Sequence, residues 1–131
     1  MSLSQIKVIK LKVVKNTKGD LLKYLNKADK FFKSFGEIYF TEIKKNKTKG
    51  WNSHKRYTCL LTVPYGKVKF TFAKKINGKK KVITISKKNY SIIVVPPKTW
   101  FKFKSITKVS LVVNTINGIH DDNETLKTSI N

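Results

Sequence analysis

The sequence predicts an all-β fold, a mostly antiparallel sandwich or barrel formed by one domain of residues 1–131. Most segments alternate apolar and polar residues with the period of two that is typical of strands. Turn residues separate these segments at short intervals, and helical patterns are scarce. A chain of 131 residues is long enough to bury one core. The expected strands cover residues 5–14, 20–25, 38–43, 57–63, 67–72, 82–86, 91–95, 100–103 and 109–115.

The N-terminal third is the least regular part of this pattern. Residues 5–14 alternate Ile6 and Val8 with lysines, and we expect this strand to lie at a sheet edge or to be exchanged between subunits. A turn at residues 16–19 leads into the next strand. Residues 26–35 are expected to form one short helical turn whose phenylalanines pack inward, namely Phe31, Phe32 and Phe35.

The middle of the chain reads as strands joined by short connections. Residues 45–50 and Tyr65-Gly66 are expected to be connections, and Asn77-Gly78 is a strong signal for a two-residue hairpin turn because both residue types tolerate positive φ. In the strand at 67–72 the apolar side chains share one face and the lysines share the other. The core-facing set is therefore Val68, Phe70 and Phe72.

The last strands also show a division into faces. The uninterrupted apolar run 92–95 predicts a strand covered on both sides and ended by Pro96-Pro97. In the following strand, alternation separates two faces, one with Trp100, Lys102 and Lys104 and the other with Phe101 and Phe103. The polar tail at 119–131 is expected to be a loosely held arm or a subunit contact.

The charge of +22 raises the question of a polyanionic partner. Of the 29 basic residues only Arg56 is arginine, although base readout and bidentate phosphate contacts favour the guanidinium group. Lysines accompany asparagines and isoleucines throughout, as an A·T-rich genome would produce. Aromatics and lysines mostly occupy opposite faces, which argues against a base-stacking platform. We therefore expect neither nucleic acid nor membrane as partner, and leave room for an anionic small ligand.

Cysteine content and hydrophobicity indicate where the protein works. The single Cys59 excludes an internal disulfide, and its apolar surroundings predict a buried, unreactive thiol. No stretch of eighteen uncharged apolar residues exists, and the N-terminus lacks the apolar block of a signal peptide. The expected location is the cytoplasm.

One segment carries a motif with recognisable spacing. Gly50, His54 and Gly66 match the first signature motif of the cupin barrels, in which two histidines and a glutamate bind a metal ion together with a later histidine. Here most of those ligand positions are replaced, and they read Asn52, His54, Cys59 and either Phe101 or Lys102. One imidazole and one thiol do not complete a metal site, so we expect a pocket without metal or other cofactor.

Four segments together resemble the sugar-nucleotide cupins, namely the dTDP-4-dehydrorhamnose 3,5-epimerases and the dTDP-4-keto-6-deoxyhexose 3,4-ketoisomerases. The likeness spans residues 16–124 and implies a cupin-type jelly-roll barrel. The matching segments are Lys18-Gly19-Asp20-Leu21, Phe35-Gly36-Glu37-Ile38-Tyr39-Phe40, Lys49-Gly50-Trp51-Asn52-Ser53-His54-Lys55 and Val95-Pro96-Pro97-Lys98-Thr99-Trp100-Phe101.

The resemblance also implies roles for individual residues. His54 would act as the proton-transferring base, and Tyr39 would donate a hydrogen bond to the developing enolate. Substrate contacts are expected from basic, amide and aromatic side chains, with the cations on the diphosphate: Lys18, Asn52, Arg56, Trp100 and Lys102.

The sequence departs from the epimerases at two catalytic positions. Asn52 stands where they carry the base, and an amide does not accept a proton at neutral pH. The segment 111–115 lacks the tyrosine that they place there. Of the expected His-x-His pair only His54 remains, which makes the ketoisomerases the closer match in side-chain chemistry.

Two function classes follow from these matches and departures. The first is a metal-independent epimerase or isomerase acting on a dTDP-linked keto-deoxysugar in cell-surface polysaccharide precursor synthesis. The second is a non-catalytic cupin that binds a sugar nucleotide after losing the base. Barrels with exposed edge strands often pair, so a homodimer is expected in either case.

Simpler roles remain open for several of these side chains. His54 is either a pocket residue or a partly exposed strand residue, and Tyr39 serves either packing or the pocket. Asn52 either orients a substrate hydroxyl or caps the turn. His120 either pairs with Asp121 or is simply solvated, and Lys18, taken alone, reads as a solvated turn residue.

Overall fold

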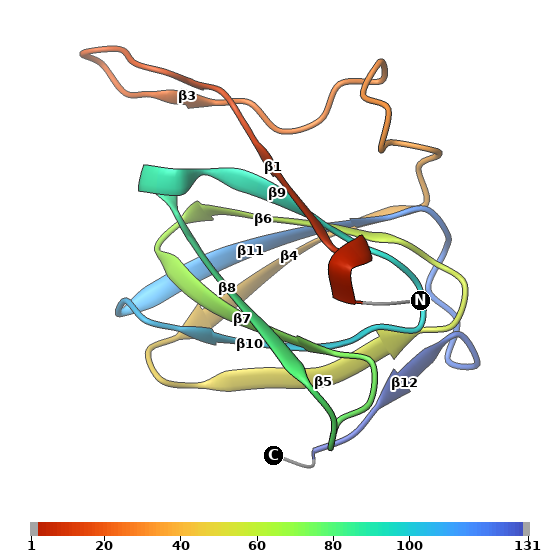
Figure 1. The fold of residues 1–131 in the computed structure, drawn as a ribbon. Helices are drawn as coiled ribbons and strands as arrows, with labels where there is room; N and C mark the ends of the chain where they lie inside the picture. Colours follow the sequence, from red (N-terminus) through yellow and green to blue (C-terminus); the bar gives the residue numbers. More distant parts are fainter. Residues whose placement is uncertain (1–2, 130–131) are drawn as a thin grey trace.

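The computed structural model describes residues 3–129, which fold into two five-stranded sheets that face each other (Figure 1). One sheet has the strand order β1-β9-β6-β11-β4 and the other has the order β12-β5-β10-β7-β8, and all their pairings are antiparallel. A small third sheet pairs β2 with β3. The prediction of an all-β, antiparallel barrel is confirmed. Within residues 3–129, no helix has the length and hydrophobicity needed to cross a membrane.

The strands are short and follow one another closely along the chain. Two 3-10 helices accompany them, η1 (Leu3–Gln5) and η2 (Lys87–Asn89). The strands are β1 (Lys7–Lys10), β2 (Val13–Val14), β3 (Leu21–Leu22), β4 (Glu37–Lys44), β5 (Thr48–His54), β6 (Cys59–Tyr65), β7 (Lys67–Ala73), β8 (Lys80–Ser86), β9 (Ser91–Val95), β10 (Trp100–Ser105), β11 (Val109–Ile116) and β12 (Thr125–Lys127).

The core lies between the two sheets, as strand alternation predicts. Val68, Phe70 and Phe72 on β7 have no exposed surface, and the intervening lysines point to solvent. On β10, Phe101 and Phe103 are also buried, and their rings pack against those of β7. Each such side chain contributes roughly 1.5–3 kcal/mol through burial. The apolar run of β9 is covered on both faces, as predicted, since Ile92 and Ile93 point to opposite faces and neither has exposed surface.

Several expected boundaries were wrong. The single strand expected at 5–14 is two strands, β1 and β2, although β1 is an edge strand as predicted. The connection expected at 45–50 contains the first half of β5. Residues 26–35 form turns and not a helical turn, and Phe35 is 62% exposed. This segment is fastened by local polar contacts, for example those from Asn26 to the main chain of Ala28 and from Asp29 to that of Asn26.

The hairpin predicted at Asn77-Gly78 joins β7 to β8, but with a longer connection than expected. The last paired residues are Ala73 and Lys80, so residues 74–79 form the loop. Neither Asn77 nor Gly78 has positive φ, and the loop closes with a bond from the Gly78 N–H to the Lys75 carbonyl. The dipeptide therefore predicted where the chain reverses direction between β7 and β8, but not the type of turn.

The C-terminal tail is docked and not loosely held. β12 pairs with β5, with Thr125 opposite His54 and Lys127 opposite Asn52. Glu124 precedes β12 and is 1% exposed. Its carboxylate accepts the main-chain N–H groups of Arg56 and Tyr57, at 2.7 and 3.1 Å, and the guanidinium of Arg56. This contact brings the tail to the open edge of β5.

Candidate functional site

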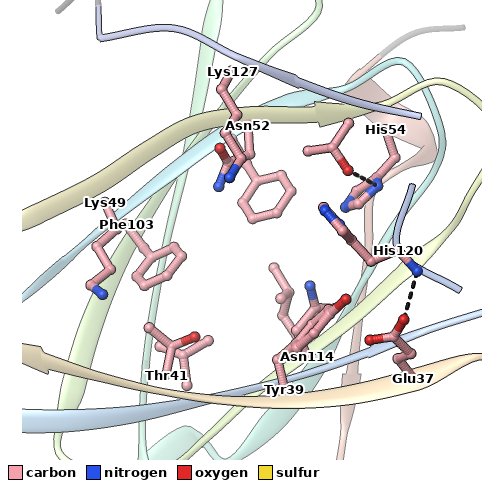
Figure 2. Close-up of a pocket in the computed structure, with 14 residues that line it drawn as sticks. Glu37, Tyr39, Thr41, Lys49, Asn52, His54, Phe103, Asn114, His120 and Lys127 are labelled. Carbon is pink, nitrogen blue, oxygen red and sulfur yellow. Dashed lines mark hydrogen bonds between the residues drawn. The ribbon is translucent and has the colours of Figure 1, made fainter. Parts of the chain in front are cut away.

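A cavity of about 490 Å³ lies between the sheets, and the docked tail forms part of its wall (Figure 2). Its lining comes from β4, β5, β6, β10, β11 and the C-terminal segment. The lining residues are Glu37, Tyr39, Thr41, Lys49, Asn52, His54, Leu61, Phe101, Phe103, Val112, Asn114, His120, Thr125 and Lys127.

Strand alternation directs the polar residues inward. On β5, Asn52 and His54 face the cavity, whereas Trp51 and Ser53 lie on the opposite face. On β4, Glu37, Tyr39 and Thr41 do the same, and the residues between them are exposed. The predicted residues His54, Tyr39 and Asn52 are thus brought together in one cavity.

The glycine of the motif allows β5 to approach β10 closely. Gly50 has φ of 109°, and a Cβ at this position would lie 2.7 Å from the Phe101 carbonyl oxygen and 2.9 Å from the Lys102 Cα. Only glycine fits both the dihedral angle and the spacing. The close approach keeps the cavity-facing part of β5 against β10, where Asn52 pairs with Phe101.

His54 is buried at one end of the cavity. The residue is 8% exposed, and its Nδ1 lies 3.4 Å from the hydroxyl of Thr125 on β12. Burial lowers the pKa of His54, and the charge of His120 lowers it further, while Glu124 acts in the opposite direction. Because the pKa falls below its ordinary value, His54 is neutral at neutral pH and able to accept a proton.

Tyr39 and Glu37 form a second polar group on the facing strand. Burial, followed by the hydrogen bond to Glu37, raises the pKa of Tyr39 to about 12. The hydrogen bond with Tyr39, and the bond from the His120 main chain, hold the pKa of Glu37 below its usual value. The phenol therefore remains protonated and serves as a hydrogen-bond donor, while the carboxylate remains charged.

An asparagine on β11 completes the polar wall. The Asn114 amide nitrogen donates to the Cys59 sulfur at 3.7 Å, and its carbonyl oxygen has no hydrogen-bond partner among the described residues. Cys59 is buried, as predicted, and burial raises its thiol pKa to about 12. The thiol is thus not a nucleophile, whereas the Asn114 oxygen is a free acceptor.

The cavity is electrostatically uneven. Lys49 on β5 and Lys127 on β12 are exposed cations in its lining, Lys127 near Asn52 and Lys49 near Phe103 (Figure 2). Glu37 and the two imidazoles lie toward the other side in the same view. A ligand with an anionic part and a neutral polar part would find complementary surroundings for both.

Four of the predicted substrate contacts lie outside the cavity lining. Lys18 is in the exposed turn between β2 and β3, on a hairpin that projects away from the barrel (Figure 1). Arg56 pairs with Glu124 at 2.9 Å. Trp100 and Lys102 are on the outward face of β10, where the Lys102 ammonium lies 4.9 Å from the ring centroid of Trp51.

Other lining residues had weak signals in the sequence. Glu37 and Thr41 lie two residues before and after Tyr39 on the same face of one strand, and Lys49 lies within the recognised motif. The sequence pattern could therefore have predicted all three. His120 and Lys127 carried no such signal, because Lys127 reaches the cavity through pairing of β12 with β5 and His120 through the docked tail and its main-chain bond to Glu37. His120 does form an imidazole-carboxylate pair, with Asp122 at 3.1 Å and not with Asp121. Among residues 3–129, no three His, Cys, Asp or Glu side chains gather as a metal site would require.

Comparison with known proteins places the fold. No protein-family model and no curated protein matches the chain. Among solved structures, a dTDP sugar isomerase from Desulfovibrio desulfuricans G20 superposes with a TM-score of 0.89 and 25% identity, over 95% of this chain and 83% of that one. This chain has the fold of the sugar-nucleotide cupins. The resemblance seen in the sequence is therefore confirmed.

Two further sugar-nucleotide cupins agree with this placement at lower identity. The sugar 3,4-ketoisomerase QdtA from Thermoanaerobacterium thermosaccharolyticum, in complex with TDP, has a TM-score of 0.82 and 22% identity, over 98% of this chain and 91% of that one. The 3,5-epimerase RmlC from Legionella pneumophila has a TM-score of 0.82 and 12% identity, over 97% of this chain and 74% of that one. These two likenesses concern the fold alone.

Proposed function

We propose that this protein is a metal-independent isomerase of a dTDP-linked 4-keto-6-deoxyhexose, in which His54 removes the proton next to the keto group. The observation that carries the proposal is a buried, neutral imidazole in the wall of a barrel cavity, opposite a phenol that remains protonated. A proton next to a carbonyl is acidic enough for a positioned imidazole to remove. A base of this kind contributes roughly 10²- to 10⁴-fold to the rate.

The charge distribution favours one orientation of such a substrate. Lys49 and Lys127 would receive the diphosphate at the rim of the cavity, since exposed ammonium groups bind phosphate oxygens without full loss of hydration. The sugar would then lie between His54 and Tyr39, with the free carbonyl of Asn114 available to a hydroxyl. The solved complexes of QdtA with TDP and, for one mutant, with TDP-4-keto-6-deoxyglucose supply the ligand class for this proposal.

Isotope exchange tests the proposed chemistry directly. The protein is incubated with dTDP-4-keto-6-deoxyglucose in heavy water, and deuterium at C3 and C5 is followed by NMR together with the product. The wild type should incorporate deuterium, and His54→Gln should lose exchange while keeping dTDP affinity. Ser53→Ala is the matched control, because Ser53 is the adjacent residue on the outward face of β5. Exchange that persists in His54→Gln would contradict the role of His54.

The same experiment decides between catalysis and binding alone. Asn52 occupies the position where the epimerases carry their base, which is the reason to keep a non-catalytic sugar-nucleotide cupin as the alternative. Tight dTDP binding without exchange in the wild type would support that alternative. The position of the incorporated deuterium, C3 or C5, separates ketoisomerase from epimerase chemistry.

The proposal includes a homodimer, a cytoplasmic location and a role in polysaccharide precursor synthesis. Ile38 and Phe40 support the dimer, because they are 45% and 72% exposed on the outer face of the edge strand β4. Light scattering after size exclusion should give twice the chain mass, and Phe40→Lys should shift it toward the monomer. Val82→Lys, at an exposed apolar position on β8, is the control. A monomeric wild type would contradict the dimer, and imaging of a tagged chain tests the location.

A further inference from the structure

The docked tail brings a second imidazole into the cavity, in addition to that of His54. His120 lies between β11 and β12, and its ring points into the cavity on the same side as His54 (Figure 2). The sequence has two histidines, His54 and His120, and both line the cavity. The chain thus presents two imidazoles to one cavity from segments far apart in sequence.

Three contacts fix the segment that carries His120. Its main-chain N–H donates to Glu37 Oε1 at 2.6 Å, and its Nε2 lies 3.1 Å from Asp122 Oδ1. Glu124 anchors the same segment to residues 56 and 57. Since a carboxylate only accepts hydrogen bonds, Nε2 carries the proton in the bond to Asp122, and Nδ1 is the nitrogen left to exchange a proton with a ligand.

The two imidazoles are close enough to influence each other. Burial is the main cause of the lowered His54 pKa, Glu124 opposes it, and the charge of His120 adds to it; the hydrogen bond with Tyr39 is the main cause of the lowered Glu37 pKa, and the charge of His120 again adds to it. The titratable and charged groups around the pair come from three elements: Glu37 and Tyr39 on β4, Lys49 on β5, and Asp122, Glu124 and Lys127 in the C-terminal segment.

Conversion of a 4-keto sugar into a 3-keto sugar moves two protons. One passes from C3 to C4, and the other passes from the hydroxyl at C3 to the oxygen at C4. A second group at the oxygens would divide these tasks, and Asn52 cannot serve, because an amide does not exchange protons at neutral pH. We propose that His120 is this second catalytic residue and transfers the oxygen-bound proton while His54 transfers the carbon-bound one. The inference rests on the proposed isomerase function.

The step balances without any oxidant or reductant. His54 takes the C3 proton, the bond electrons form the C3–C4 double bond, and the carbonyl electrons move onto O4. The His120 imidazolium, stabilised by Asp122, donates a proton to O4. His54 then returns its proton to C4, while the double-bond electrons shift and O3 becomes a carbonyl as its proton passes to His120. Both imidazoles regain their starting states.

Separate measurement of exchange and turnover tests this division of roles. In heavy water, His120→Gln should keep deuterium incorporation at C3 within about tenfold of wild type, while formation of the 3-keto product falls by about 10²-fold or more. His54→Gln should lose both. Asn123→Ala is the control on the same segment, since this exposed side chain is not part of the cavity lining. Binding of dTDP, measured by calorimetry, should be unchanged in all variants.

Two outcomes would overturn the role of His120. One is a His120→Gln variant that forms product within about twofold of wild type. The other is a variant that loses C3 exchange and product formation equally, since this would place His120 at the carbon or in the structure and not at the oxygens.

An NMR titration separates failure of this inference from failure of the proposed function. Removal of the His120 charge should raise the pKa of His54, and Asn123→Ala should leave it unchanged. If the wild type binds dTDP without exchange, the isomerase function and its His120 step are contradicted. If the His54 pKa nevertheless rises in His120→Gln, the coupling of the two imidazoles is retained. No shift of the His54 pKa in His120→Gln would contradict the electrostatic coupling of the two imidazoles and, with it, the role of His120.

Discussion

The carboxylate of Glu124 accepts both the main-chain N–H of Arg56, at 2.7 Å, and the Arg56 guanidinium Nε, at 2.9 Å. The guanidinium was expected to hold a diphosphate, but its side chain is 70% exposed and paired with a carboxylate that has no exposed surface. This pair joins the C-terminal segment to the turn after β5. The segment in turn supplies His120, Thr125 and Lys127 to the cavity.

Replacement of Glu124 should destabilise the protein and detach the tail. Glu124 Oε2 accepts both main-chain N–H groups and Oε1 accepts the Arg56 guanidinium, so in Glu124→Gln the amide oxygen can keep the first pair of bonds, but the amide nitrogen then faces Arg56 Nε and cannot accept its proton, and the ion pair is lost. The expected loss is about 2 kcal/mol in the free energy of unfolding, measured with denaturant. Hydrogen exchange at residues 125–127 should accelerate. Glu42→Gln, on the exposed face of β4, is the control and should change neither quantity.

The same carboxylate predicts a pH dependence of stability. Burial raises the pKa of Glu124, but the hydrogen bonds from Arg56 and Tyr57 outweigh burial, and the net pKa lies below the ordinary value of 4.5. A depressed carboxyl pKa stabilises the folded state above the unfolded pKa, and this contribution is lost as pH falls through the folded pKa. Wild type should therefore lose more stability than Glu124→Gln between about pH 5 and pH 3. Parallel curves would contradict this prediction.

The pH profile of catalysis should reflect the lowered pKa of His54. Burial favours the neutral imidazole, so the base form persists below the ordinary pKa of 6.5. The acidic limb of kcat/KM should have its midpoint below pH 6.5. The phenol of Tyr39, with a pKa of about 12, should add no basic limb in the range where the protein is stable. An acidic limb above pH 6.5 would show that another group controls the reaction.

Lys49 and Lys127, the two cations in the cavity lining, should bind the nucleotide. Lys18, on the projecting hairpin, is the control. Lys49→Ala and Lys127→Ala should each raise the Kd for dTDP roughly two- to fivefold, as expected for an exposed ion pair. The double variant should also weaken the dependence of Kd on salt. Lys18→Ala should have no effect, since Lys18 is outside the cavity lining. Calorimetry over a range of salt concentrations checks these effects.

The motif glycine should tolerate no side chain. In Gly50→Ala the new Cβ would approach the Phe101 carbonyl to 2.7 Å at a φ of 109°, so β5 would have to move away from β10. We expect a loss of about 1–3 kcal/mol. Gly19→Ala is the matched control, because its φ is 135° but its Cβ would meet nothing within 4 Å. Thermal unfolding should separate the two variants, and equal shifts would mean that strain alone, and not the contact with β10, sets the cost.

The sequence by itself determined the strand class, the inward face of β7 and the burial of Cys59, whereas for β10 it separated two faces without deciding which one points inward. Alternation with period two has a direct physical meaning, because it divides a strand into a core face and a solvent face. His54 and Asn52 on β5, which was not among the predicted strands, were found through the motif, and Tyr39 on β4 was found through the resemblance.

Only the tertiary structure decided which distant segments meet. His120, Lys127 and Thr125 reach the cavity because β12 pairs with β5, and that pairing depends on a carboxylate buried against residues 56 and 57. Arg56, Trp100 and Lys102 were excluded from the cavity by the direction of their strand or by a closer partner. Such contacts join residues far apart in the chain and leave no local periodicity, so a single sequence does not disclose them.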